Sequence, residues 1–545
     1  MTRLQALAPL RAPSPKRLLS LYVRGSLWYS LLVAGMALVG FESIYLNPTP
    51  FHALFAPAGG SWAAILTAFL LLALGVFVCW RHLNPGYVVS RRRASLLIVL
   101  IVAGGLVTRR LAVHDAVASV IPEATVWGTW WSAFRWHLMP VVLTLAVLFV
   151  GAAYCRILPW KNFELTRRQV RWFLVTMILF TAFFSIAVAM VRDGMAGVTD
   201  AYERSKYEYI GDIGKTSGIR TLFGSYNELH PYLSMHSKVH PPGPVAILWI
   251  MSIIIFSANP GPLSVTTVIL GSTALIPLWL LARCLFSTRI AIMSCILYSL
   301  IPSIVLFTAT SADILFMPLT LWTLYFFWRA IHGPSTPYAL CAGVMYGVLS
   351  LTSFSLIGIG VFFGFVGLWR LLEPERRIAV IRTAALMLAA FLGCHLAVRF
   401  WSGFDVVECF RLAKSQFDED QANLQVVSPR FPGWAFRLLN PVCMFYFAGI
   451  PVSMLLVWRL CRPEPGSKGL FIVFGLTLFV LNLLYIARGE GERSAMYVLP
   501  FAVIPAAHLL EQLCERTRSF TPLLVTAGFL AIQTWLTESL LYTYW

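Results

Sequence analysis

Long apolar runs recur along almost the whole chain and constrain its fold more than any other feature. Each run approaches about twenty residues, the length that a helix needs to cross a hydrocarbon core of roughly 30 Å. Only 12% of the 545 residues are charged, whereas about a quarter are charged in soluble proteins. The sequence therefore predicts an all-α polytopic membrane protein with little room for a soluble domain.

The basic residues lie in short clusters between the apolar runs. The formal net charge is +18, but clusters such as residues 91–93 and 167–171 follow the positive-inside pattern of cytoplasmic loops. We therefore expect the lipid bilayer as a partner and no nucleic acid. With the N-terminus in the cytoplasm, the fifth span leaves it, and the polar residues 192–242 lie on the extracytoplasmic face.

The number of crossings depends on how residues 244–282 are read. If every apolar run crossed fully, Arg283 and Arg376 would lie outside. If residues 244–282 make a single net crossing, both arginines lie in the cytoplasm, as the positive-inside rule favours. We prefer this interpretation, which gives about fifteen crossings and an external C-terminus. The candidate spans are 25–46, 62–80, 95–113, 140–158, 172–191, 244–282, 289–308, 314–331, 336–353, 356–372, 383–401, 441–460, 469–487, 494–512 and 519–540.

The first external loop carries acidic residues at helical spacing. Asp200, Glu208 and Asp212 recur every fourth or eighth residue, so an amphipathic helix at the membrane surface would show one acidic face. Tyr202 and Tyr209 would then face lipid headgroups or protein. A solvated helix face is the alternative interpretation.

The same loop returns to the bilayer through the segment His236-Ser-Lys-Val-His240-Pro-Pro-Gly243. Proline cannot continue a preceding helix, so the segment holds His240 at the mouth of the next span. Either histidine could instead be a simple interfacial residue. The His-x-x-x-His spacing could serve a metal, but no further His or Cys cluster lies nearby, and the ten cysteines show no ligand-like spacing.

An acidic loop directly after a span, followed by Pro-Pro where the next span begins, resembles the GT-C class of polytopic glycosyltransferases. The similarity is greatest to bacterial protein mannosyltransferase and aminoarabinose transferase families. It covers 172–520, with the external loop 192–243; residues 1–171 form an added module of about four helices and 521–545 a C-terminal helix. The chain departs from the family pattern because no plain Asp-Glu pair ends the first core helix.

The resemblance implies a GT-C-like helical bundle in the bacterial cytoplasmic membrane, with an external active site. Its substrates would be a polyprenyl-phosphate-linked sugar and an acceptor glycan, lipid or protein.

An inverting transfer needs a carboxylate base, and the leaving phosphate needs cationic partners. The candidate bases, in order of preference, are Asp212, Asp193, Asp200 and Glu208. The candidate phosphate ligands are His240, Lys238, His236, Arg488 and Arg493. The supporting residues are Tyr209, Asp313, Glu490 and Glu492. No metal or other cofactor is indicated.

Three alternatives stay open at the level of sequence. Arg488 and Arg493 could form a salt-bridged turn with Glu490 and Glu492, or anchor lipid headgroups. A transporter or flippase of lipid-linked glycans would also have many spans, but would favour charged groups within them. A surface-polysaccharide polymerase or ligase would use a lipid-linked donor and large external loops.

Overall fold

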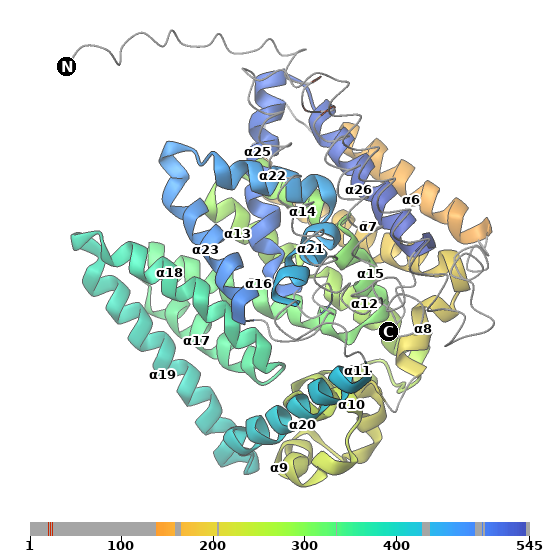
Figure 1. Ribbon diagram of the computed structural model, residues 1–545, viewed down its shortest axis with the longest axis vertical. Helices are drawn as coiled ribbons and strands as arrows, with labels where there is room; N and C mark the ends of the chain where they lie inside the picture. The colour runs from red at the N-terminus through yellow and green to blue at the C-terminus, as the bar shows by residue number, and fades with distance from the viewer. Residues whose placement is uncertain are drawn as a thin grey trace.

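The structure, a computed structural model, describes residues 20, 22, 24, 138–157, 165–203, 207–333, 335–427, 436–484, 493 and 496–540. Within these ranges the chain forms helices and no β-strand (Figure 1), so the predicted all-α fold class is confirmed. The expected spans 25–46, 62–80 and 95–113 lie outside the described residues.

Short and long helices alternate along the described chain. Those up to residue 332 are α6 (Leu138–Ile157), α7 (Arg167–Asp193), α8 (Ala196–Glu203), η3 (Tyr209–Lys215), α9 (Ile219–Leu229), η4 (His230–Tyr232), α10 (Met235–Lys238), α11 (Gly243–Ile254), α12 (Pro260–Ser272), α13 (Leu275–Leu285), α14 (Thr288–Tyr298), α15 (Pro302–Thr310), η5 (Ala312–Leu315) and α16 (Phe316–His332). Those that follow are α17 (Thr336–Ser350), η6 (Phe354–Ile359), α18 (Gly360–Leu371), η7 (Pro374–Arg376), α19 (Arg377–Ser402), α20 (Val406–Val427), α21 (Phe436–Phe447), α22 (Ile450–Cys461), η9 (Pro465–Ser467), α23 (Lys468–Leu484), η10 (Met496–Val498), α25 (Pro500–Thr517) and α26 (Thr521–Leu540).

Several of these helices are long and apolar enough to cross a membrane, as expected of a multi-pass membrane protein. By length and composition the described residues contain six, or seven if one bent pair counts as a single span. The six are Arg167–Val191, Pro260–Leu285, Ala312–His332, Phe354–Leu371, Pro374–Ser402 and Met496–Thr517. Helix α11 has 12 residues and reaches only about 18 Å, which fits a single crossing by 244–282.

The expected span 289–308 consists of two helices that are apolar enough together to cross a membrane, with a break between them. Helices α14 and α15 are bent by 56° at a short break. Proline stands at the first position of α15, and the preceding residue Ile301 is extended, with φ −69° and ψ 138°. The proline ring disfavours a helical residue before it, so the helix cannot run through Pro302.

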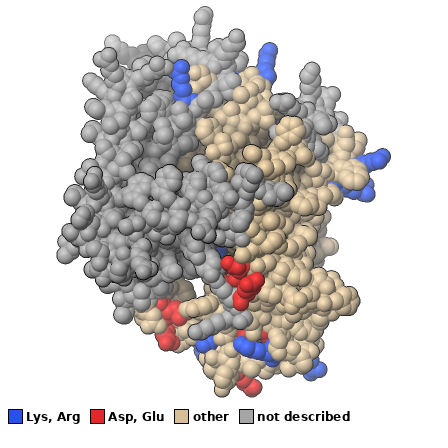
Figure 2. Space-filling view, turned by 90° about the vertical axis from the view of Figure 1, so that its right-hand side faces the viewer, with Lys and Arg blue, Asp and Glu red and all other residues tan. Residues whose placement is uncertain are grey.

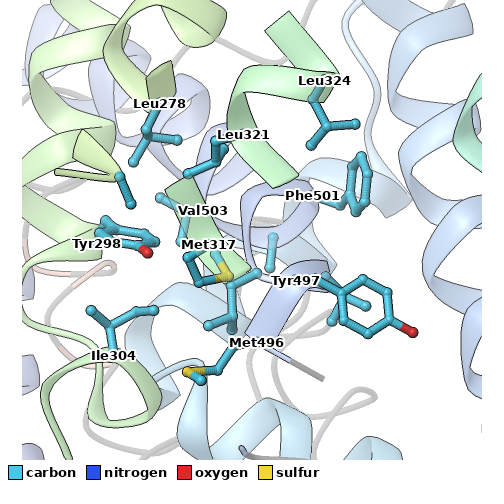
Figure 3. Packing of buried hydrophobic residues seen from close by; sticks show 14 of the residues in the cluster. Leu278, Tyr298, Ile304, Met317, Leu321, Leu324, Met496, Tyr497, Phe501 and Val503 are labelled. Atoms are coloured by element: carbon cyan, nitrogen blue, oxygen red, sulfur yellow. The ribbon is translucent and has the colours of Figure 1, made fainter. Parts of the chain in front are cut away.

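Large side chains fill the centre of the bundle, where helices distant in sequence meet. In Figure 3, Leu278 of α13 and Tyr298 of α14 lie close to Met317 of α16, and Phe501 of α25 lies beside Leu324 of α16. Tyr298 is completely buried. Lipid tails are as apolar as these side chains, so close packing stabilises the bundle more than burial alone.

Small residues bring α17 and α19 into direct contact. A Cβ atom at Gly343 would lie 2.3 Å from the carbonyl oxygen of Met387, and one at Gly347 would lie 2.7 Å from Cβ of Cys394. Neither position has room for a larger side chain. This is the close helix approach that small residues permit in membranes.

The polar segments collect at one end of the bundle. Helices α9, α10 and α20 lie together at the bottom of Figure 1, and the side-chain amide of Asn227 on α9 donates to the carbonyl of Asp405, just before α20, at 2.9 Å. Helix α20 at this end has 22 residues. On the face in Figure 2 the described acidic side chains lie in the lower half.

The expected continuous acidic helix across residues 200–213 is wrong. Helix α8 ends at Glu203, and the chain resumes as the 3₁₀ helix η3 at Tyr209, with the extended Glu208 before it. Tyr202, Tyr209 and Ile213 are buried, so these side chains face protein. Tertiary contacts, described next, outweigh the i+4 pattern here.

Candidate functional site

Asp212 anchors the first external segment. Its side chain is 0% exposed, and Oδ1 accepts the Lys215 ammonium at 2.7 Å. The Ser234 backbone N–H reaches both carboxylate oxygens at 3.1 Å, and the Ser234 hydroxyl donates to Oδ2 at 2.6 Å. The carboxylate therefore ties η3 to the start of α10.

The His-Pro-Pro-Gly element is fixed against a distant part of the chain. The N–H of Gly243 donates to the carbonyl of Leu351 at 2.9 Å, and a Cβ at Gly243 would lie 2.2 Å from that oxygen. Tyr226 of α9 donates its hydroxyl to the carbonyls of Ser237 at 2.9 Å and His240 at 3.2 Å. Helix α11 begins at Gly243, as expected, so His240 stands at its entrance.

Asp313 occupies a break between α15 and α16. The Ser311 hydroxyl accepts the backbone N–H of Asp313 at 3.2 Å, which caps the short helix η5. The Tyr209 hydroxyl donates to Oδ1 of Asp313 at 3.3 Å, and Nε of Arg493 lies 3.5 Å from Oδ2. All three side chains are buried, so the pairing of the two charges is shielded from water.

Two imidazoles complete this group. Nδ1 of His236 lies 3.2 Å from Oε1 of Glu208. The ring of Tyr209 lies 5.9 Å from that of His236 and meets the ring of His240 edge-on at 5.6 Å. We call the six residues the polar cluster: Glu208, Tyr209, His236, His240, Asp313 and Arg493.

The pKa values of the two imidazoles of the polar cluster are shifted in opposite directions. Burial disfavours the charged form of His236, but the charge and hydrogen bond of Glu208 outweigh it and raise the pKa above 6.5. Burial lowers the pKa of His240 to about 4, although Asp313 opposes the change. Burial also raises the pKa of Tyr209 well above 10, so its hydroxyl stays a donor. The cluster thus holds one imidazole that takes up a proton more readily than usual and one that stays neutral near neutral pH.

The remaining predicted residues lie around the polar cluster or outside the described chain. Asp200 is half-buried on α8 and Lys238 half-buried at the end of α10. Asp193 is the last residue of α7, and its side chain is outside the description. Arg488, Glu490 and Glu492 lie outside the described residues, so their predicted roles stay predictions.

Several contacts of the predicted residues are not apparent from the sequence. Ser234 is the partner of Asp212, and the one signal for it is that a serine directly before a short helix is a common cap position. Phe316, whose ring lies 6.3 Å from that of His240, follows Asp313 by less than one turn. Burial raises the pKa of Tyr202, and the negative charges of the nearby Glu208 and Asp313 raise it further. The Tyr202 hydroxyl donates to the hydroxyl oxygen of Thr267 at 2.8 Å.

The described carboxylates have no arrangement typical of a metal site. Among the described residues, no three His, Cys, Asp or Glu side chains are grouped so that they could hold an ion. Asp313, Glu208 and Asp212 each face a cationic or imidazole partner instead.

A family model described as dolichyl-phosphate-mannose-protein mannosyltransferase matches residues 239–401. This part contains His240 and Asp313 of the polar cluster. The match confirms the resemblance to GT-C membrane glycosyltransferases. Direct comparison with curated protein sequences gives no match.

Solved structures of an oligosaccharyltransferase from Archaeoglobus fulgidus are distantly similar. The complex with zinc and sulfate is 16% identical with a TM-score of 0.43, and the alignment covers 67% of this chain and 53% of that one. The form tethered to an acceptor peptide is 13% identical with a TM-score of 0.45, covering 68% and 56%. The chain thus spans little more than half the length of these relatives. Over residues 239–401 the chain is similar to dolichyl-phosphate-mannose-protein mannosyltransferases.

Proposed function

We propose that this protein transfers a sugar from a polyprenyl-phosphate donor to a hydroxyl of an extracytoplasmic acceptor, with inversion at the anomeric carbon. The observation that carries the proposal is the buried pair of Arg493 and Asp313, with the pair of His236 and Glu208 in the same cluster, at the polar end of a membrane bundle. The description of the matching family, which names a dolichyl-phosphate sugar, supports a lipid-phosphate donor.

Arg493 and His236 would stabilise the leaving phosphate. As the bond between the anomeric carbon and the phosphate oxygen breaks, negative charge grows on that oxygen. Arginine offers a planar fork of N–H donors to phosphate oxygens, and donors held in a dry site act strongly because they need no reorganisation. Asp313 and Tyr209 would orient the guanidinium, and Glu208 would keep His236 charged. The described cations suffice for this role, so the proposal includes no metal or cofactor.

The acceptor hydroxyl must lose its proton as its oxygen attacks the anomeric carbon. The candidate bases are Asp193 at the end of α7, Asp200 on α8 and Glu208. Asp212 was the first candidate from sequence, but Lys215 and Ser234 occupy both of its oxygens. We therefore propose a structural role for Asp212 and place the base among the other three. The substitutions Asp193→Asn, Asp200→Asn and Glu208→Gln each remove one candidate carboxylate. The variant that loses turnover would identify the base.

The proposed setting is the bacterial cytoplasmic membrane, with the polar cluster at the extracytoplasmic surface. A protein, lipid or glycan would serve as acceptor. Lys238 would add positive charge beside the donor phosphate.

The test uses the purified full chain in lipid nanodiscs with a panel of polyprenyl-phosphate hexoses and pentoses, and it follows loss of the donor. We expect donor consumption by the wild type and by the control Arg399→Ala, which removes only the exposed ion pair with Asp405. We expect at least a hundredfold loss in Arg493→Ala. Transport of intact donor without cleavage of the sugar–phosphate bond would favour the transporter and overturn the proposal.

A further inference from the structure

His240 is held rigidly on both sides. Its carbonyl accepts the Tyr226 hydroxyl at 3.2 Å, and three residues later the N–H of Gly243 pairs with Leu351. Pro241 and Pro242 restrict the backbone between these contacts. The imidazole lies between the rings of Tyr209 and Phe316, so its direction in the polar cluster is fixed.

The two ring nitrogens of His240 have different surroundings. The backbone of Thr352 lies close enough to the ring to favour its protonated form. Nδ1 is buried and has no hydrogen-bond partner in the part of the chain that the structure describes. A neutral imidazole carries its one N–H on either nitrogen; with that N–H on Nε2, facing Thr352, Nδ1 presents a lone pair.

An unpaired buried acceptor is unfavourable, and buried polar atoms in proteins are usually paired. Burial and the neighbouring charges of His236 and Arg493 keep the ring neutral, with a pKa of about 4. A lone pair repels phosphate oxygens and accepts only from O–H or N–H groups. His240 therefore does not have the chemistry of the phosphate ligand that the sequence suggested.

We propose that Nδ1 of His240 accepts a hydrogen bond from a substrate hydroxyl, which belongs either to the donor's sugar ring or to the acceptor. This inference rests on the proposed glycosyl transfer. Arg493 and His236 then face the phosphate end of the substrate, and His240 faces a hydroxyl beside it. The arrangement separates recognition of charge from recognition of the sugar or acceptor.

Two substitutions separate the ring nitrogens. In His240→Asn the amide oxygen can occupy the place of Nδ1 and accept, whereas the N–H that faces Thr352 is lost. In His240→Gln the longer amide can reach the place of Nε2 and donate to Thr352, whereas the acceptor at Nδ1 is lost. Thermal unfolding of both variants in nanodiscs checks that they fold, and donor turnover is measured with the same polyprenyl-phosphate sugars.

We expect turnover of His240→Asn within threefold of the wild type and a loss of about tenfold or more in His240→Gln. Donor affinity is also measured in the absence of acceptor. If His240→Gln weakens this affinity, the hydroxyl belongs to the sugar. If the affinity is unchanged and only turnover falls, the hydroxyl belongs to the acceptor. Turnover kept by His240→Gln and lost by His240→Asn would overturn the inference while the proposed function stands. A wild type that neither binds nor consumes any donor would overturn both.

Discussion

Asp313 holds Arg493 with one carboxylate oxygen and Tyr209 with the other. The distances are 3.5 Å from Oδ2 to Nε of Arg493 and 3.3 Å from Oδ1 to the Tyr209 hydroxyl. The three residues come from distant parts of the chain, so the fold places the guanidinium through Asp313. The proposed chemistry depends on that placement.

Replacing Arg493 by lysine keeps the charge but removes the planar fork. Lysine presents a single flexible ammonium, so we expect donor affinity to fall less than turnover, with turnover reduced about tenfold or more. Equilibrium binding and turnover of a polyprenyl-phosphate sugar would be measured on the same preparation. Equal activity of Arg493→Lys and wild type would argue that the guanidinium geometry is not used.

Tyr209→Phe removes only the hydroxyl that holds Asp313. We expect turnover to fall about tenfold, the value of one hydrogen bond to a charged group, with little change in unfolding temperature. Tyr226→Phe is the matched control, because Tyr226 is equally buried but bonds main-chain carbonyls. The same loss of turnover in both variants, scaling with stability, would point to general packing and not to Asp313.

The charge of His236 predicts a pH dependence. Its folded pKa is raised above 6.5 by Glu208, so its contribution to stability is complete below about pH 6.5 and is lost as pH rises through the raised pKa. The groups that face it are Glu208, Tyr209, His240, Asp313 and Arg493. The pKa of His240 lies near 4 and that of Tyr209 well above 10, so neither titrates near neutral pH.

Unfolding temperature and donor binding, measured from pH 6 to 9, should therefore decline more steeply in the wild type than in His236→Gln. Glu208→Gln should move the decline to lower pH. A decline of the same size in His236→Gln would assign the effect to another group.

Asp212→Ala separates a structural carboxylate from a base. The change leaves the Ser234 N–H and the Lys215 ammonium without their partner, so we expect a loss of about 3 kcal/mol in the free energy of unfolding. At low temperature, where the protein stays folded, turnover should remain within tenfold of the wild type. A variant of normal stability without turnover would return the base to Asp212.

Gly243→Ala tests the contact that positions His240. The added methyl would meet the Leu351 carbonyl at 2.2 Å, so we expect a loss of about 2 kcal/mol in stability and reduced turnover. Gly214→Ala is the control, because a Cβ there meets nothing within 4 Å. Equal stability of the two variants would show that the 240–243 segment does not pack against Leu351 as described.

The sequence predicted the fold class and singled out polar residues that the structure brings together. Hydropathy and charge signs suffice for the fold class because insertion in a bilayer depends on them directly. The residues singled out at Glu208, Tyr209, His236, His240, Asp313 and Arg493 do lie together, although their chemical roles are proposals.

Details that depend on tertiary contacts could not be predicted. Acidic residues at i+4 spacing suggested one helix, but Ser234 draws Asp212 into a different element and α8 ends at Glu203. The proline that bends the span at Pro302 was visible, but uniform hydropathy concealed the break. The role proposed for His240, a neutral ring that accepts a hydrogen bond, depends on its neighbours Thr352 and Phe316. No local sequence pattern connects these residues to His240.

The most direct test is an experimental structure of the full chain in nanodiscs with a polyprenyl-phosphate sugar bound. We predict that the phosphate contacts Arg493 and His236 within hydrogen-bond distance and that a hydroxyl lies against His240. A donor bound elsewhere, with no contact between its phosphate and Arg493 or His236, would contradict the account.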